Sequence, residues 1–290
     1  TSNAKTLTIS SGILNFNNFK LQLWQNNGIL SNNGTLNGSG NIRAILNHTF
    51  SGSGSYNNIS FENQYRLTFD TDLTLTNHLI SSTGTCIINS GKTVTISGYF
   101  RSKSSPGRNL TNNGTIVINS IVDFFSTPTG DFRTSSERFN SLNGSVELPS
   151  GGALPETLDG GYKNLTLSGV TTSNFSFSVN GDWTNSGTFT SSGSSTITYN
   201  GISEQAVGGS GTSNFEDVSI TNSNGINISD ASHTFNTSGT FTNQGNLGVD
   251  GTFNSTNATI FNGSSTQIIS GSGTSNFEDV SITNSNGINI

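Results

Sequence analysis

Residues 210–228 read Ser-Gly-Thr-Ser-Asn-Phe-Glu-Asp-Val-Ser-Ile-Thr-Asn-Ser-Asn-Gly-Ile-Asn-Ile, and residues 272–290 repeat the same string 62 positions later. Self-similarity at a fixed period is typical of arrays and solenoids, in which each repeat packs on its neighbours. A catalytic site is built once in a chain, whereas an exact duplication within Gly-, Asn-, Ser- and Thr-rich sequence indicates a lengthened scaffold. The duplication therefore predicts a solenoid and favours a structural role.

Short segments of alternating apolar and polar residues recur along the chain, and they predict short β-strands. Examples are Leu7-Thr-Ile9, Leu73-Thr-Leu75, Leu165-Thr-Leu167 and Val218-Ser-Ile220. Between such segments recurs a turn unit of Asn, any residue and Gly, as at Asn32–Gly34, Asn112–Gly114, Asn185–Gly187 and Asn243–Gly245. Because Asn and Gly tolerate positive φ, we expect that conformation at these corners. No segment has the 3.6-residue apolar period of a helix, so the chain is predicted to be all-β.

An aromatic residue placed three positions before an alternating strand sets a longer period. It occurs at Tyr56, Tyr162, Phe215 and Phe277, and the first of these three intervals is twice the second. The second and third intervals give the length of a repeating unit. Such a unit divides into three coils of roughly 18–21 residues each, a usual circumference for a parallel β-helix. We therefore predict a single continuous, right-handed parallel β-helix (β-solenoid) of about 14 coils over residues 1–290, rather than several β-sandwiches. In such a stack, Phe packs on Phe inside and Asn amides form ladders along the axis.

Residues 99–163 depart from this regularity, whereas residues 164–290 are predicted to form regular repeats of about 62 residues. All four prolines and six of the eleven Lys and Arg residues lie in 99–163. Proline disfavours central strands, so we expect coils with irregular protruding loops there. Aromatic and basic side chains in these loops could stack on a glycan or an anionic polymer and bond to it, or they could pack back onto the side of the helix. The candidate ligand-contacting residues are Phe100, Arg101, Phe132, Arg133 and Arg138.

The charge distribution argues against a nucleic-acid partner, and the lack of a long apolar run argues against insertion into a membrane. The net charge is −6, and all eleven basic residues lie at or before Lys163, while eight of the seventeen carboxylates follow it. So acidic a surface is not expected to bind nucleic acid. No apolar run approaches the roughly 18–20 residues that span a membrane as a helix, so membrane insertion is not expected.

The residues that could carry chemistry do not form a recognisable constellation. Asp70-Thr-Asp72 could place two carboxylates on one strand face, as a glycosidase would need, but the His and Arg companions of a polygalacturonase-like site are absent. His48, His78 and His233 lack metal-ligand spacing and are expected on the surface or at corners. Cys86 is expected to be buried and inert. We predict no enzyme activity, no cofactor and no metal site, with a weak cation site at Glu216-Asp217 and Glu278-Asp279 as an open alternative.

Threonine pairs raise one further possibility. Thr74-x-Thr76 and Thr93-x-Thr95 are separated by close to one coil. Regular Thr pairs on a flat solenoid face would indicate ice binding. The series does not continue through the chain, so the sequence does not predict an ice-binding face.

The segment from Phe261-Asn-Gly through Gln267 to Phe277-Glu-Asp-Val280 resembles a repeat of very large secreted, cell-surface proteins of Bacteroidota, of the form "FNG…Q-I-G…F-x-N-L-T-I-N". The resemblance covers residues 143–290 well, 1–98 more loosely and 99–142 poorly. It implies a parallel β-helical, adhesin-like extracellular protein, often exported through a dedicated outer-membrane route. It assigns no functional residues, because the repeats of that family are scaffold.

Together these observations predict a stalk or fibre segment of an extracellular, adhesin-like surface protein. The alternative is a β-helical protein that binds or degrades polysaccharide. Because the second copy of the duplicated string has no polar cap after it, we expect further repeats or end-to-end self-association there. A glycan or another cell-surface ligand is the remaining possible partner.

Overall fold

The computed structural model describes residues 6–24, 26–57, 60–63, 65–75, 79–81, 85–97, 100–102, 109–119, 138–157 and 160–290. The chain falls into two compact units, unit 1 (Thr1–Ser145) and unit 2 (Val146–Ile290). Within the described residues there is no helix, and the strands pair in parallel from turn to turn. The predicted all-β solenoid is confirmed.

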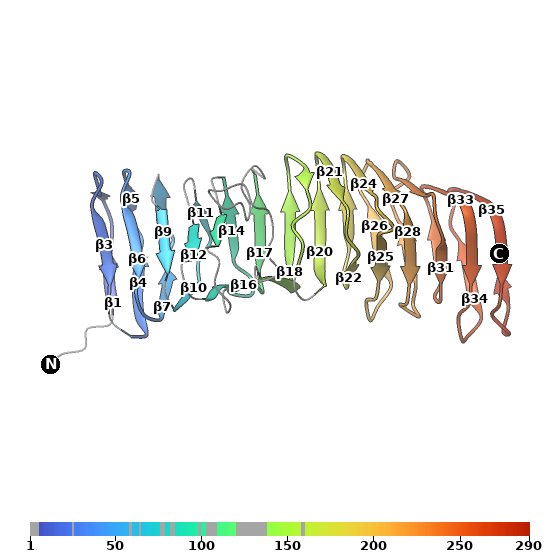
Figure 1. Cartoon of the computed structure of the whole chain (residues 1–290), viewed down its shortest axis with the longest axis horizontal. Coiled ribbons are helices and arrows are strands. Elements are labelled where there is room, and N and C mark those ends of the chain that lie inside the picture. The colour runs from blue at the N-terminus through green and yellow to red at the C-terminus, as the bar shows by residue number, and fades with distance from the viewer. Residues whose placement is uncertain are drawn as a thin grey trace. The chain divides into compact units, whose positions relative to one another are not determined.

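Unit 1 is a stack of turns whose strands form parallel ladders on three sides (Figure 1). The first ladder contains β1 (Thr6–Ile9), β4 (Gly28–Asn32), β7 (His48–Ser51), β10 (Arg66–Phe69), β13 (Thr85–Ile88), β16 (Asn109–Asn112) and the start of β18 (Arg138–Leu148). The second side contains β2 (Ile13–Asn15), β5 (Thr35–Asn37) and β8 (Ser55–Asn57), and then β11 (Leu73–Leu75), β14 (Thr93–Ile96) and β17 (Thr115–Ile118). The third ladder contains β3 (Lys20–Leu23), β6 (Asn41–Ala44), β9 (Ser60–Asn63), β12 (Leu79–Ser81) and β15 (Phe100–Ser102).

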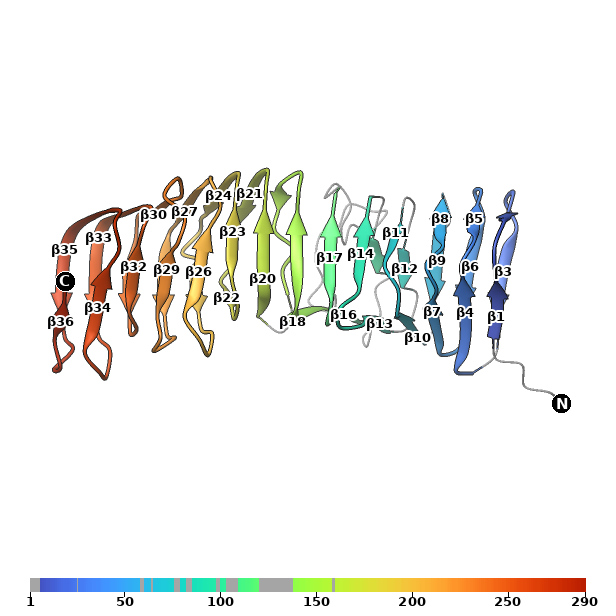
Figure 2. The same cartoon turned by 180° about the vertical axis from the view of Figure 1, so that it is seen from behind.

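Unit 2 also has three ladders, and Figure 2 shows β26, β29 and β32 of the first one side by side. The first ladder contains the second half of β20 (Gly161–Leu167), β23 (Trp183–Asn185), β26 (Gln205–Gly208), β29 (Ile226–Ile228), β32 (Leu247–Val249), β34 (Gln267–Ser270) and β36 (Ile288–Asn289). The second ladder contains β19 (Gly152–Ala153), β21 (Val170–Ser173), β24 (Thr188–Ser191), β27 (Thr212–Phe215), β30 (Thr234–Thr237) and the first halves of β33 (Thr252–Phe261) and β35 (Thr274–Ile282). The third ladder contains the first half of β20, β22 (Phe177–Val179), β25 (Thr196–Tyr199), β28 (Asp217–Ile220), β31 (Phe241–Asn243) and the second halves of β33 and β35.

The number of turns differs slightly from the predicted value of about 14. The prediction assumed turns of uniform length, but the turns are not uniform. Along the first ladder of unit 2, Leu165 pairs with Trp183, Trp183 with Val207 and Val207 with Ile228, so the middle turn of these three is the longest. The turn that joins Leu110 to its partner Phe139 is longer still. Corner loops absorb these differences while the strands keep their register.

The two copies of the duplicated string occupy equivalent places three turns apart. In the second ladder, Phe215 lies opposite Thr237, which lies opposite Ser255, which lies opposite Phe277. The period of the duplication therefore corresponds to three turns of unit 2.

Aromatic side chains stack along the interior of unit 2, as expected when every second strand residue points inward. The ring centroids of Phe215 and Phe235 lie 4.6 Å apart, those of Phe235 and Phe253 5.5 Å, and those of Phe253 and Phe277 5.3 Å. The predicted Phe stack is confirmed.

The Asn-x-Gly corners are built differently from the expectation. Gly34, Gly114, Gly187 and Gly245 are absent from the residues with positive φ. Glycine is required there because a Cβ would collide with the preceding turn, for example at 2.1 Å from the Gly169 carbonyl oxygen in the case of Gly187. The buried Asn185 closes the corner, since its Oδ1 accepts a hydrogen bond from the Gly187 N–H at 3.0 Å. Its Nδ2 donates to the Thr212 carbonyl of the next turn at 2.9 Å.

The Asn-Gly and Gln elements of the resemblance form a second corner. The Gly201 N–H donates to Gln205 Oε1 at 2.7 Å, and Gln205 Nε2 donates to the Val179 carbonyl at 2.8 Å. Gln267 repeats this arrangement, accepting from the Gly263 N–H at 2.9 Å and donating to the Asn243 carbonyl at 3.0 Å. Both glutamines are buried, so their amides satisfy backbone groups that the corner leaves unpaired.

Candidate functional site

The residues predicted to contact a ligand are not all in loops. Phe100 and Arg101 lie in β15, where they pair with Leu79 and Ile80 of the preceding turn. Arg138 begins β18 and pairs with Asn109. Phe132 and Arg133 lie outside the described residues. A role in ligand contact stays a prediction for all five.

Asp70 and Asp72 do not share a strand face. They lie between β10 and β11, at a corner of unit 1. Asp70 Oδ1 accepts a hydrogen bond from Asn89 Nδ2 at 3.0 Å, and Asp72 Oδ1 accepts one from the Thr93 N–H at 2.7 Å. Both bonds join neighbouring turns, which is a structural use of the carboxylates.

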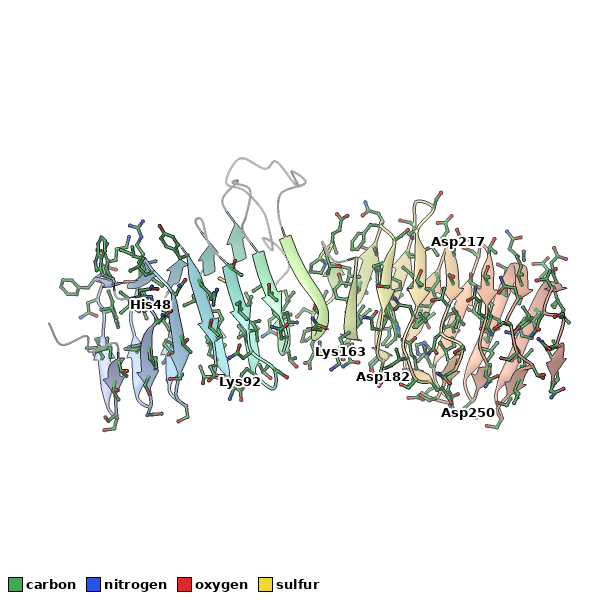
Figure 3. All side chains as sticks on the ribbon, turned by 90° about the horizontal axis from the view of Figure 1, so that it is seen from below. His48, Lys92, Lys163, Asp182, Asp217 and Asp250 are labelled. Atoms are coloured by element: carbon green, nitrogen blue, oxygen red, sulfur yellow. The ribbon has the colours of Figure 1, made fainter. Side chains whose placement is uncertain are left out.

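Three aspartates of unit 2 are used in the same way. Asp182 accepts a hydrogen bond from the Ala206 N–H at 2.9 Å, Asp217 from the Thr240 N–H at 2.6 Å and Asp250 from the Ser272 N–H at 3.1 Å. Figure 3 places Asp182 and Asp250 along one edge of unit 2 and Asp217 along the opposite edge. In the part of the chain that the structure describes, no group of three or more His, Cys, Asp or Glu residues could hold a metal ion.

The histidines and the cysteine that can be described are buried. His48 and His233 are 4% and 0% exposed, so neither lies on the surface. His233 lies at the corner before β30 and His48 is the first residue of β7, whereas His78 lies outside the described residues. Burial lowers the pKa of both imidazoles below the usual value, although each Nδ1 lies 3.0 Å from a backbone carbonyl oxygen, that of Leu46 or Gly209. Burial raises the pKa of the Cys86 thiol to about 12, so this thiol is inert, as expected.

The most regular surface of unit 2 is the outward side of its second ladder. Its first column contains Val170, Thr188, Thr212, Thr234, Thr252 and Thr274, and its second contains Thr172, Thr190, Asn214, Asn236, Asn254 and Asn276. Each residue lies directly opposite the next one in its column, and all of those from Thr188 onward are at least partly exposed. We call the five turns from Thr188 to Asn276 the Thr/Asn face.

The second column of the Thr/Asn face is bonded to itself. Asn236 Nδ2 donates to Asn214 Oδ1 at 2.8 Å, Asn254 Nδ2 to Asn236 Oδ1 at 2.8 Å, and Asn276 Nδ2 to Asn254 Oδ1 at 2.7 Å. The predicted asparagine ladder is confirmed. The threonine hydroxyls of the first column, by contrast, make no hydrogen bond to the protein among the described residues, so they are free to bond to water.

Sequence reasoning missed this face because it compared threonines at a fixed interval. Successive members of the threonine column are unequally spaced in the sequence, with Thr188 and Thr212 the farthest apart and Thr234 and Thr252 the closest. In unit 1, Thr74 lies opposite Thr95, not opposite Thr93 as a fixed interval implied. The available signal was the tripeptide Thr-x-Asn, which begins at residues 212, 234, 252 and 274.

Comparison with known protein families, characterised proteins and solved structures gave no match for this chain. Among the described residues, no helix is long and apolar enough to cross a membrane.

Proposed function

We propose that this chain is a non-catalytic structural segment, a stalk or fibre section, of a secreted, adhesin-like surface protein. The observation that carries the proposal is that recurring polar side chains, among the residues that the structure describes, bond to the adjacent turn. Asp72, Asp182 and Asp217 each accept a backbone N–H from the following turn. Such groups add to the backbone ladders that hold the turns together.

The inner corners support the same proposal. Buried amides such as Asn185 and Gln205 bond to the backbone of their own turn and of a neighbouring turn. A stack tied at its sides and corners resists bending and sliding, which a stalk requires. The resemblance of residues 143–290 to surface-protein repeats supports a location outside the cell. Continuation into further turns, or stacking of another subunit, belongs to this proposal.

Lengthening the repeat tests the proposal. A variant in which residues 229–290 are appended after Ile290 gains one full period of the duplication, which is three turns. At roughly 4.8 Å for each turn, unit 2 should lengthen by about 14 Å and stay folded. Small-angle X-ray scattering measures the maximum dimension, and circular dichroism checks the strand content.

The matched control appends the same residues in scrambled order, which should add no ordered turns. An extended chain that misfolds, or one whose strand content does not rise above that of the control, would contradict the proposal. Turnover of a polysaccharide by the intact chain, lost on Asp70→Asn or Asp72→Asn, would favour the enzyme alternative instead.

A further inference from the structure

We infer that the Thr/Asn face of unit 2 binds ice. This face, defined above by its five consecutive turns from Thr188 to Asn276, is a two-column array of small hydroxyl and amide side chains. The inference concerns the side surface of the stack, and it goes beyond the structural role proposed above.

The array has fixed spacings in two directions. Neighbouring parallel strands lie about 4.8 Å apart, and residues i and i+2 of one strand lie roughly 6.6 Å apart. The asparagine amides fix the first spacing further through their hydrogen bonds of 2.8, 2.8 and 2.7 Å. Hexagonal ice presents oxygen atoms at repeat distances comparable with both spacings. A regular array can therefore bond to several lattice positions at once.

The face is also rigid before it binds. Beneath it, the inward residues include Phe189, Phe235 and Phe253, and the last two rings lie 5.5 Å apart in a stacked arrangement. Threonine is stiff about χ1, because two heavy atoms branch from its Cβ. A surface already held in its bound conformation loses little entropy when it orders water or docks on a crystal.

The chemistry of the columns matches water better than other occupants. Between Thr188 and Asn276 the two columns contain neither a charged nor an aromatic residue, and carboxylates such as Glu216, Asp250 and Glu278 lie at the margins. A glycan-binding surface would normally offer aromatic rings for stacking. Packing against a second copy would bury the threonine hydroxyls without assured partners, which costs free energy. A water lattice satisfies the hydroxyls and leaves the methyl groups in contact with its surface.

The test uses the intact chain and measures thermal hysteresis and ice-crystal shaping. Thr212→Tyr, Thr234→Tyr and Thr252→Tyr in combination place three bulky rings across the face and should abolish both activities. The matched control is Thr198→Tyr with Thr242→Tyr, which changes outward threonines of the third ladder and should leave both activities unchanged. Circular dichroism and thermal unfolding check that each variant folds.

A second set of variants, with smaller side chains, tests the same positions in case the tyrosine variant misfolds. Thr→Ser at positions 212, 234 and 252 removes three methyl groups but keeps the hydroxyls, and it should reduce thermal hysteresis while the strand content stays the same. The inference is overturned if the intact chain neither shapes ice nor shows thermal hysteresis, or if the control loses as much activity as the face variant. It is also overturned if the face variants leave ice unaffected but abolish self-association or binding to insoluble polysaccharide.

Discussion

Residues 210–228 and 272–290 have identical sequences but different surroundings. In the first copy, Val218 and Ile220 are 1% and 0% exposed, whereas their counterparts Val280 and Ile282 are both 50% exposed. The first copy is covered by the turn that contains β30, β31 and β32, and the second is the last described turn. In a solenoid, therefore, the same residues are core or surface according to whether another turn packs on them.

The contacts of each copy with the turn before it are, by contrast, alike. The Thr212 N–H donates to the Gly187 carbonyl at 2.9 Å, and the Thr274 N–H donates to the Gly251 carbonyl at 2.9 Å. Substitutions placed in both copies can therefore separate the contribution of the following turn from that of the preceding turn.

The largest difference is expected for the central phenylalanine of the string. Phe215 packs against the rings of Trp183, Phe189 and Phe235 at centroid distances of 5.4, 5.5 and 4.6 Å. Phe215→Ala should lower the free energy of unfolding by about 3–5 kcal/mol, because it leaves a cavity that the stack cannot close. Phe277→Ala should cost less than half as much, since Phe277 lies in the last described turn. Denaturant unfolding of the two variants measures the difference, and equal losses would show that the covering turn contributes little.

Replacing the first glycine of the string by alanine should lower stability in both copies. A Cβ on Gly211 would lie 2.2 Å from the Gly187 carbonyl oxygen, and one on Gly273 would lie 2.0 Å from that of Gly251. Gly211→Ala and Gly273→Ala should each destabilise the adjoining turn by about 1–3 kcal/mol through overpacking. The protection of the Thr212 and Thr274 amides from hydrogen exchange measures the destabilisation of each turn separately. Protection lost in only one copy would mean that the contacts with the preceding turn differ.

The smallest effect on stability is expected for the aspartate of the string. Asp217 Oδ1 accepts the Thr240 N–H of the following turn at 2.6 Å. Asp217→Ala should cost about 1–2 kcal/mol, because a backbone donor loses a charged acceptor. Asp279→Ala should be neutral, since no described turn follows to supply a donor. Thermal unfolding of both variants provides the comparison, and a loss of stability on Asp279→Ala would contradict it.

Part of this molecule could be predicted from its sequence. Alternation such as that of Val218-Ser-Ile220 predicts a strand from a local property, because period 2 places apolar side chains on one side. The Asn-x-Gly corners were located correctly, but the reason was wrong. Position 187 requires glycine because Gly169 of the preceding turn lies too close to leave room for a Cβ. That contact exists only once the turns are stacked.

The sequence by itself determined the all-β class, the inward Phe stack and the three-turn period, because each depends on a repeat written directly in the chain. Only the tertiary structure decided the Thr/Asn face and the burial of each copy. Backbone pairing sets the register across turns. Because the corners differ in length, the number of residues between paired threonines changes from one turn to the next, as it does from Thr212–Thr234 to Thr234–Thr252. Whether Val218 or Val280 lies in the core depends on a neighbouring turn that no property of the string itself encodes.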